Sequence, residues 1–467
     1  MQMLSNPVLP NEMATWIEHA TGASIVDATR HAGGGRNEAW IVCVRRADDS
    51  EYRVFFRWDR SDPAITGDPW TLRREAGVYR ALSSTALPVA RFIALHPDAQ
   101  AMLLTVVEGD ARFALVDDAQ RATRIAQDFM RHLAELHRLD VASLGLADPT
   151  RPTVRDHVTA QLDEIEALLR FRGGVPETAL GVALTWLRGN VPDYGGPAVL
   201  VQGDTGPGNF MFIDDRVSAI VDWELAHLGD PMDDLAWVSL RAVQEPFTDL
   251  GERFADYAHL SGNAIDLERI RYYRVLAEAK IIAMSHGRDA HGAGDPDGAG
   301  DPGARLVFGH LHRRLLVETL LEAMGLAPDP VEPIEADEPG EWHRYYGVVL
   351  DQLRTTVSPR IADGFALQRT KGLARAIKYL EAADRLGRGC ASAELLDLTD
   401  VLGRRPDDVA DGRRQLAIAV RDGTVDPAGA LRVAQRRVCR DNELLRQASG
   451  ALADRHYDAL ARFSSGR

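Results

Sequence analysis

The first hundred residues alternate apolar and polar positions or gather β-branched and aromatic residues in short runs, and both patterns are typical of β-strands. Polar or glycine-containing stretches separate five such runs. Between the third and the fourth run, Leu72, Tyr79 and Leu82 recur with helical spacing, which predicts a helix over 71–83. The predicted strands are 24–31, 38–46, 52–58, 89–95 and 101–107.

From residue 108 onward the apolar period is mostly that of helices. The exception is a pair of short apolar runs, 210–213 and 217–221, which flank the polar stretch 214–216 and predict a β-hairpin. We therefore expect an α+β fold, with a β-rich part followed by a mainly helical part. The predicted helices are 125–139, 155–171, 176–190, 252–260, 266–286 and 305–325.

Three oxygen-bearing side chains surround the predicted hairpin. Asn209 stands at the start of its first strand and Asp222 at the end of its second, so pairing of the strands places the two roughly opposite each other. Asp204 lies five residues before Asn209, across a loop that contains two glycines. We expect the three side chains to converge at one end of the hairpin.

Carboxylate and amide oxygens are the ligands that Mg²⁺ prefers, which suits Asn209 and Asp222. Asp204 is spaced away from this pair and could accept a proton from an attacking hydroxyl. Together these roles are those of phosphoryl transfer. The alternative is a polar hairpin in which the same residues only form turns and caps, which is the commoner role of Asp and Asn.

The motif around these residues resembles the catalytic segment of the aminoglycoside phosphotransferase and choline kinase family, in which His-Gly-Asp is followed by four residues, Asn, and a strand ending in Asp. The resemblance covers roughly residues 20–325 and is strongest to the branch that includes kinase domains fused to certain acyl-CoA dehydrogenases. The matching segments are Gln202-Gly203-Asp204, Asn209, Asp222-Trp223-Glu224, Leu228-Gly229-Asp230-Pro231 and Asp234-Leu235-Ala236-Trp237.

The resemblance implies a bilobal, protein-kinase-like fold and an ATP- and Mg²⁺-dependent phosphotransferase. Asp204 would be the catalytic base, and Asn209 and Asp222 would hold the metal. Gln202 departs from the family, which has His at this position; we expect its carboxamide to hydrogen-bond the backbone as imidazole would. Asp230 precedes a proline at a predicted helix start, where it could be a simple cap, but the resemblance makes it a buried brace of the catalytic loop.

A glycine run, Gly33, Gly34 and Gly35, separates the first two predicted strands. Glycine lets backbone N–H groups approach a polyphosphate, although most such runs are plain hairpin turns. Arg57 stands where the family carries a Lys or Arg that holds the nucleotide phosphates. Glu75, on the inward face of the predicted helix 71–83, is the expected partner of Arg57; the alternative is a surface Glu on an amphipathic helix.

By resemblance, the backbone of Thr105, Val106 and Val107 forms the hinge between the lobes and contacts the adenine of ATP. We accordingly divide the chain into an N-terminal lobe, 1–107, and a helical catalytic lobe, 108–326.

The remainder of the chain follows a Pro-rich acidic linker, 327–340. Beyond it, 341–467 shows helical stripes such as Leu373, Ile377 and Leu380 but no group of catalytic residues. This segment resembles an uncharacterised helical domain that often follows kinases of this branch. We expect it to pack on the catalytic lobe, to form a homodimer or to bind a partner.

Composition narrows the function classes further. The 467 residues are 45% hydrophobic and 26% charged, with a net charge of −15, as in a globular protein that would repel nucleic acid. No apolar run reaches the length of a membrane span and the N-terminus does not read as a signal peptide, so we expect no membrane association. The three scattered cysteines suit a reducing compartment, and we expect a cytoplasmic protein.

The expected substrate is a small molecule with a hydroxyl group, either a hydroxyacyl thioester or another metabolic alcohol. Two alternatives stay open: an antibiotic phosphotransferase of the aminoglycoside type, and a pseudokinase scaffold that keeps the fold without turnover. An acidic surface would attract a cationic antibiotic, whereas the phosphates of a thioester cofactor would require basic residues near the acceptor.

Overall fold

The computed structural model describes residues 9–30, 38–287 and 301–465. These residues form two compact units. The first contains the described residues of 1–157, 194–267 and 459–467, and the second contains those of 158–193 and 268–458. Each unit is therefore assembled from segments that are distant in the sequence. Within the described residues, no helix is both long and apolar enough to cross a membrane.

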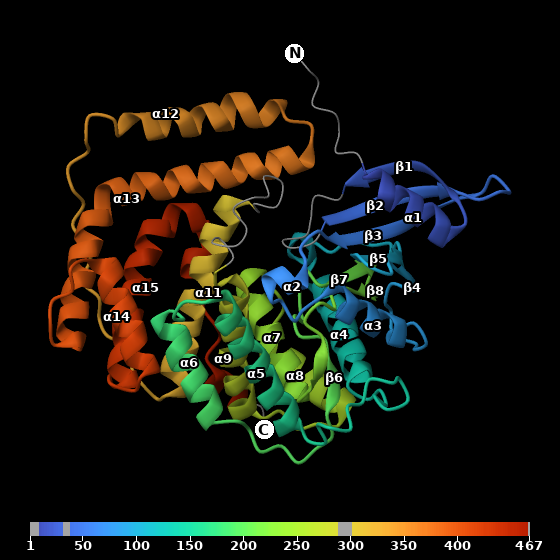
Figure 1. The fold of residues 1–467 in the computed structure, drawn as a ribbon, viewed down its shortest axis with the longest axis horizontal. Coiled ribbons are helices and arrows are strands. Elements are labelled where there is room, and N and C mark those ends of the chain that lie inside the picture. The colour runs from blue at the N-terminus through green and yellow to red at the C-terminus, as the bar shows by residue number, and fades with distance from the viewer. Residues whose placement is uncertain (1–8, 31–37, 288–300, 466–467) are drawn as a thin grey trace. The chain divides into compact units, whose positions relative to one another are not determined.

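A five-stranded antiparallel sheet begins the first unit, with the strand order β1-β2-β3-β5-β4 (Figure 1). The prediction of five strands is confirmed, and most ends agree within one or two residues. β4 begins later than predicted because its first residues, which follow Pro88, bridge to the catalytic hairpin instead: Val89 pairs with Ile220. The strands are β1 Ser24–Arg30, β2 Glu38–Arg45, β3 Glu51–Asp59, β4 Phe92–Leu95 and β5 Gln100–Thr105.

One face of this sheet is covered by α1 (Asn11–Thr21), a helix that the periodicity did not predict. Met13 and Ile17 of α1 are buried against Val54, Phe56 and other apolar residues of the sheet. The helix ends at Gly22, whose φ of 63° is a left-handed conformation that closes the last turn. The apolar face of α1 is short, which explains why the sequence pattern was weak.

The predicted hairpin is present as β7 (Phe210–Ile213) and β8 (Arg216–Ile220). Its turn is one residue tighter than predicted, because Arg216 belongs to the second strand and pairs with Ile213. Asp214 adopts a φ of 52°, a left-handed conformation that Asp tolerates and that a two-residue hairpin turn requires.

Helices complete the first unit around the hairpin. A two-stranded ladder of β6 and β9 leads into α7, whose N-terminal proline follows the cap residue Asp230. Helix α3 begins at the cap Thr71, whose hydroxyl accepts from Arg74 N–H. The elements are α2 Pro63–Thr66, α3 Leu72–Leu82, η1 Phe113–Leu115, α4 Ala119–Leu136, β6 Val199–Val201, β9 His227–Gly229, α7 Pro231–Gln244, α8 Leu250–Ser261 and η5 Leu460–Ser465.

The second unit is helical. The first residues of its helix α5 belong to the first unit. Its core joins helices from both sides of the catalytic segment: Val182 of α6 packs with Leu398 of α13, Leu416 of α14 and Val433 of α15. Figure 1 shows α12 running alongside the first half of the long α13. The elements are α5 Val154–Arg172, α6 Thr178–Gly189, α9 Leu267–Ser285, α11 Pro302–Ala323, α12 Arg344–Gln352, η2 Leu353–Val357, η3 Ser358–Arg360, α13 Gly364–Leu402, α14 Val409–Arg421, α15 Pro427–Ser449 and η4 Gly450–Asp454.

The predicted α+β fold class is confirmed: a five-stranded antiparallel sheet is combined with many helices and a helical C-terminal region. The segment 327–340 contains no regular secondary structure, as expected of a linker. It is nevertheless held within the second unit, because Asp329 pairs with Arg436 at 2.7 Å and Asp337 with Arg388 at 3.1 Å. The division at 107, 326 and 340 stays a prediction.

Candidate active site

The loop before the hairpin brings Asp204 and Asn209 into direct contact. The Asn209 amide nitrogen donates to the Asp204 carboxylate at 2.6 Å and to the Asp204 backbone carbonyl at 2.7 Å. The backbone carbonyl of Asn209 in turn accepts from Val221 N–H at 3.0 Å, so Asn209 lies beside the residue that precedes Asp222. Asp204 and Asn209 are therefore together at this end of the hairpin, with Asp204 oriented by Asn209. The convergence of all three side chains stays a prediction.

Arg241 of α7 holds the loop between these residues. Its guanidinium donates to the Pro207 carbonyl at 2.8 and 3.0 Å and lies 3.7 Å from the Asp204 carboxylate. Gly208 has a φ of 90°, and a Cβ at this position would stand 2.3 Å from the Arg241 guanidinium. The positive φ is therefore the feature that favours glycine here, whereas the end of the flexible Arg241 side chain could shift.

Asp234, also on α7, holds the backbone ahead of Asp204. Its carboxylate accepts from the N–H groups of Gln202 and Gly203, both at 3.0 Å, and from the Thr205 hydroxyl. His137 lies 2.9 Å from the same carboxylate and 2.7 Å from the Tyr257 hydroxyl. Burial opposes the charge of Asp234, but His137 and the loop donors outweigh it and lower the pKa of this carboxyl.

Asp234 therefore braces the loop that carries Asp204. The bracing role that the resemblance assigned to Asp230 stays a prediction. Asp230 is fully buried, and its side chain accepts from Met232 N–H at 2.9 Å as the N-cap of α7. An Asp directly before a proline at a helix start is placed to cap, whereas Asp234, one turn later, faces the loop. The only sequence signal for Asp234 was its position in the extended motif.

Gln202 behaves as predicted. Its fully buried carboxamide donates to the carbonyl oxygens of Val221 and Asp222, at 3.0 and 2.8 Å. These bonds tie the strand before the catalytic loop to the end of β8. The replacement of the family's His therefore leaves the backbone of Asp222 held in place.

Arg57 joins three elements in one cluster. From β3, its guanidinium hydrogen-bonds the fully buried Glu75 of α3 and lies 3.5 Å from Asp222 and 3.8 Å from Glu224. Burial alone would lower the pKa of Arg57, but Glu75 and Asp222 raise it above its usual value. The predicted Arg57–Glu75 pair is present, and it extends to the end of the hairpin.

Asp222 has two features expected of a cation ligand. Its φ of 62° is unusual for a residue other than glycine, and such conformations cluster at functional sites. Its Oδ1 atom is buried without a hydrogen-bond donor among the described residues. Because the Asn209 amide nitrogen is committed to Asp204, the Asn209 carbonyl is the side-chain atom left to face a cation. The donor set is oxygen-only, which fits Mg²⁺.

This candidate site is not a metal cage formed by the protein alone. Across the described ranges, no group of three or more His, Cys, Asp or Glu side chains is arranged around a common point. Mg²⁺ typically binds through one or two protein ligands, with water and substrate phosphates completing its shell. The pair of Asn209 and Asp222 is consistent with that mode.

The expected nucleotide contacts are placed only in part. Gly33, Gly34 and Gly35 lie outside the described residues. Thr105 ends β5, and its N–H donates to the Arg91 carbonyl at 2.9 Å, so this group belongs to the sheet and is not available to an adenine. Val106 and Val107, which follow the last strand residue, are half-buried and stay the predicted hinge contacts.

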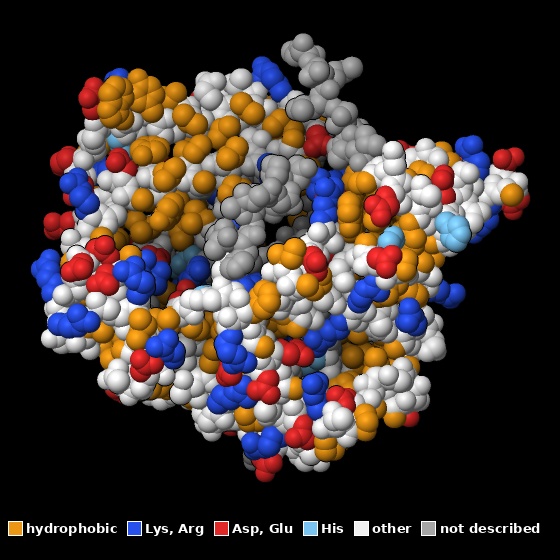
Figure 2. Space-filling view, in the orientation of Figure 1, with side chains coloured by type: hydrophobic (Ala, Val, Ile, Leu, Met, Phe, Trp, Pro, Cys, Tyr) orange, Lys and Arg blue, Asp and Glu red, His pale blue; other side chains and the backbone are white. Residues whose placement is uncertain are grey.

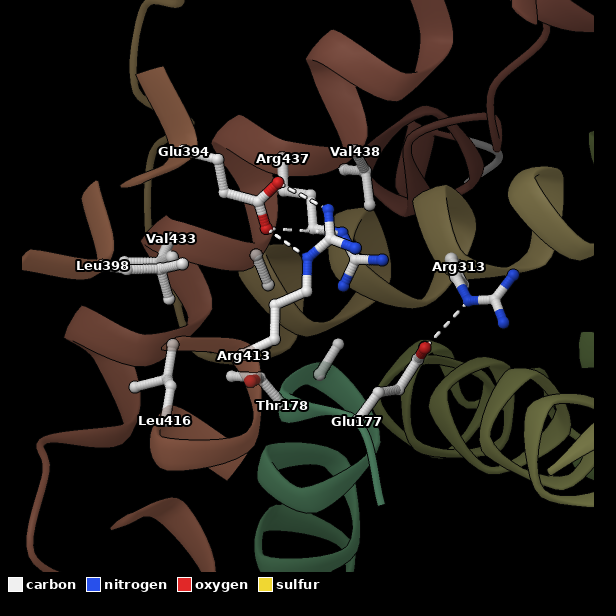
Figure 3. A pocket seen from close by; sticks show the side chains of 12 residues that line it. Glu177, Thr178, Arg313, Glu394, Leu398, Arg413, Leu416, Val433, Arg437 and Val438 are labelled. Carbon is white, nitrogen blue, oxygen red and sulfur yellow. Dashed lines mark hydrogen bonds and ion pairs between the residues drawn. The ribbon is translucent and has the colours of Figure 1, made fainter. Parts of the chain in front are cut away.

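A pocket in the second unit is a separate feature (Figure 3). Its cavity of about 30 Å³ has room for little more than a water molecule. Figure 3 shows Arg413 in contact with Glu394, the two joined by bonds of 2.6 and 2.5 Å, and Arg313 bound to Glu177 at 2.8 Å. These ion pairs lie between α6, α11, α13 and α14, and we interpret them as part of the packing of this unit.

Comparison with known proteins identifies similar chains. The model of the phosphotransferase enzyme family matches residues 34–273. Acyl-CoA dehydrogenase family member 11 of Mus musculus is 32% identical over 241 residues, which are 46% of this chain and 31% of the relative. Its counterpart in Rattus norvegicus is 32% identical over 178 residues, covering 36% and 22%. The chain thus spans less than a third of these relatives.

Among solved structures, the macrolide 2′-phosphotransferase of Brachybacterium faecium is similar, with 18% identity. The similarity covers 62% of this chain and 95% of that one, at a TM-score of 0.42.

Proposed function

The chain belongs to the phosphotransferase enzyme family, and we propose that it transfers the γ-phosphoryl group of ATP to a hydroxyl of a small molecule, with Mg²⁺ as the metal. The observation that carries this proposal is the cluster at Arg57, which joins the sheet, α3 and the end of the catalytic hairpin through Glu75 and Asp222. A basic strand residue paired to a helix carboxylate and facing a metal-ligand Asp is the arrangement that phosphoryl transfer in kinases requires.

Asp204 acts on the acceptor. Its carboxylate, oriented by Asn209, accepts the proton of the acceptor hydroxyl while that oxygen forms a bond to the γ-phosphorus and the bond to the β-phosphate oxygen breaks. The Arg241 guanidinium lies 3.7 Å from this carboxylate. The rate gain comes mainly from positioning the two substrates and from stabilising the negative charge.

The nucleotide is held by residues other than Asp204. Arg57 contacts the phosphates, while Glu75 fixes the position of the guanidinium. Asp222 and Asn209 are the residues that would hold magnesium, which when bound supplies charge neutralisation at the phosphates. Gln202 keeps the backbone of Asp222 in register with the catalytic loop.

We further propose that the acceptor is a hydroxyacyl thioester. The support for this is the similarity to acyl-CoA dehydrogenase family member 11, whose name refers to acyl-CoA chemistry. The hydroxyl of such a thioester is an alcohol that can accept the phosphoryl group.

The test uses the purified full chain with ATP and Mg²⁺. Calorimetry should detect ATP binding that weakens when Mg²⁺ is removed, and the melting temperature should rise with ATP by binding linkage. ADP release should then be measured with hydroxyacyl-CoAs, amino alcohols and aminoglycosides, and we expect turnover with the first class.

Each other result has a definite meaning. Turnover with aminoglycosides alone would replace the thioester by an antibiotic acceptor. ATP binding without turnover on any acceptor would favour a pseudokinase. Absence of Mg²⁺-dependent ATP binding would refute the phosphotransferase proposal itself.

A further inference from the structure

An apolar face of the second unit is formed by α12 and the first half of α13. We define this α12–α13 face by Trp342, Tyr345, Val348 and Val349 at α12 and Leu373, Ile377 and Leu380 on α13. Four of these side chains expose more than half of their surface: Trp342 66%, Val348 53%, Leu373 51% and Leu380 52%. Figure 2 shows hydrophobic side chains gathered over these two helices. Contiguous exposed apolar patches larger than about a few hundred Å² are rare on isolated globular proteins.

Part of this face is a groove between the two helices. Tyr345, Val348 and Val349 recur at helical spacing on one side of α12, and Leu373, Ile377 and Leu380 do so on α13. A pocket of about 350 Å³ lies between Tyr345 and Val349 on one side and Ile377 on the other. Within α12 no residue is buried. The helices therefore face each other without filling the space between them.

Contacts at one end of the groove and on the opposite side of α13 hold the two helices in place. His343, just before α12, lies 3.1 Å from Asp384 and 3.7 Å from Glu381 of α13. The opposite side of α13 belongs to the core of the unit, where Tyr379 packs with Val307 of α11 and Leu445 of α15. α13 thus has one apolar side that is covered and a second that is not.

We propose that a second copy of this chain docks on the α12–α13 face, so that two helix pairs related by a twofold axis form a four-helix bundle. At ~150–250 Å² for the two aromatic residues and about 150 Å², the lower end of this range, for Val and Leu, the exposed fractions of the defining residues other than Ile377 leave roughly 450–600 Å² uncovered. This is more than half of the ~800 Å² that each partner buries in a standard protein interface. A twofold interface needs a self-complementary surface, and facing apolar helix pairs provide one.

The charges near the groove are mixed. Glu381 and Asp384 are carboxylates at its end, and the Arg344 guanidinium lies over the Tyr345 ring, whereas a membrane-binding helix carries mainly Lys and Arg beside its apolar face. Lys378, next to Ile377, points away from the groove and lies 3.5 Å from the Gln447 carbonyl on α15. The concave shape of the groove suits a helix of a partner protein more than a flat bilayer.

The test measures the mass of the full chain in solution by sedimentation velocity over a range of concentrations. We expect a dimer for the native sequence. Val349→Glu and Leu380→Glu place a carboxylate in the interface from either helix, and each should weaken dimerisation at least tenfold while far-UV circular dichroism and melting temperature at low concentration stay unchanged. Leu396→Glu is the matched control, because Leu396 lies on the same helix with 63% exposure but outside the face; it should remain dimeric.

A second measurement covers the case in which a variant fails to fold. A photo-crosslinking residue in place of Tyr345 should yield a covalent dimer in which the crosslinked peptide comes from residues 342–380. A native chain that is monomeric at every concentration overturns the proposal, whether or not it sediments with anionic vesicles. A native dimer that neither glutamate substitution weakens, or whose crosslink maps elsewhere, overturns it as well.

Discussion

At the residue scale, Asp204 and Asp222 are the same amino acid in two different environments. Asp204 accepts a hydrogen bond from Asn209 and lies near Arg241. Asp222 has a left-handed backbone conformation and a buried carboxylate oxygen without a hydrogen-bond donor among the described residues. The first environment suits a proton acceptor and the second a cation ligand.

The two residues should therefore respond differently to the same substitution. Asp204→Asn keeps the shape and removes the basic oxygen, so turnover should fall by roughly two to four orders of magnitude while ATP affinity is little changed. Asp222→Asn removes negative charge from the proposed magnesium position, so calorimetry should show weaker Mg²⁺-dependent ATP binding as well as lost turnover.

Loss of nucleotide binding in Asp204→Asn but not in Asp222→Asn would show that the two roles are assigned the wrong way round. Circular dichroism of both variants serves as the control for folding.

At the element scale, β3 and α3 are joined by a buried ion pair, Arg57 with Glu75, whereas the same strand carries an exposed pair, Arg53 with Glu108. The side chain of Glu75 is fully buried, while that of Glu108 is 69% exposed. A buried charge that loses its partner is left without solvation, and an exposed charge regains water. The two pairs thus form a matched comparison on one strand.

We expect Glu75→Gln to lower the free energy of unfolding by about 3 kcal/mol or more, because Arg57 loses its principal counter-charge. It should also weaken ATP binding, since the guanidinium is no longer fixed. Glu108→Gln should change the unfolding free energy by less than ~1 kcal/mol. Urea unfolding and calorimetry measure both effects, and equal losses of stability in the two variants would contradict the structural role of the Arg57 pair.

At the scale of the whole molecule, the C-terminal helices share a core with helices of the predicted catalytic lobe. Leu398 of α13 packs with Val182 of α6, and Tyr379 of α13 with Val307 of α11. Asp329 and Asp337 hold the intervening linker segment to α15 and α13. The packing indicates that 341–467 contributes to the stability of α6 and α11.

Leu398→Ala should accordingly cost about 2–5 kcal/mol of unfolding free energy, because Leu398 is 1% exposed within this shared core. Leu396→Ala, two residues away on the same helix and 63% exposed, should cost no more than ~0.5 kcal/mol. ATP affinity should be unchanged in both folded variants, since the candidate active-site residues lie in the first unit. Urea unfolding and calorimetry test this, and a large loss in Leu396→Ala would contradict it.

The sequence by itself determined the features that depend on neighbouring residues. Strand alternation predicted the five-stranded sheet, and two apolar runs around a polar turn predicted the hairpin that brings Asn209 beside Asp204. The backbone contacts of Gln202 were also predictable, because a carboxamide can replace the donor of the family's His. Periodicity and turn chemistry encode such contacts directly, since they act over one strand, one helix turn or one loop.

Only the tertiary structure decided which distant partners meet. It showed that Asp234 holds the loop that carries Asp204, that Arg57 reaches Asp222 as well as Glu75, and that α6 and α11 each pack with the C-terminal helices. The short α1 likewise depends on the sheet that buries Met13 and Ile17. The physical reason is that many carboxylates and many apolar stripes have the same local sequence pattern. Which of them come into contact depends on burial and packing, and these are properties of the whole fold.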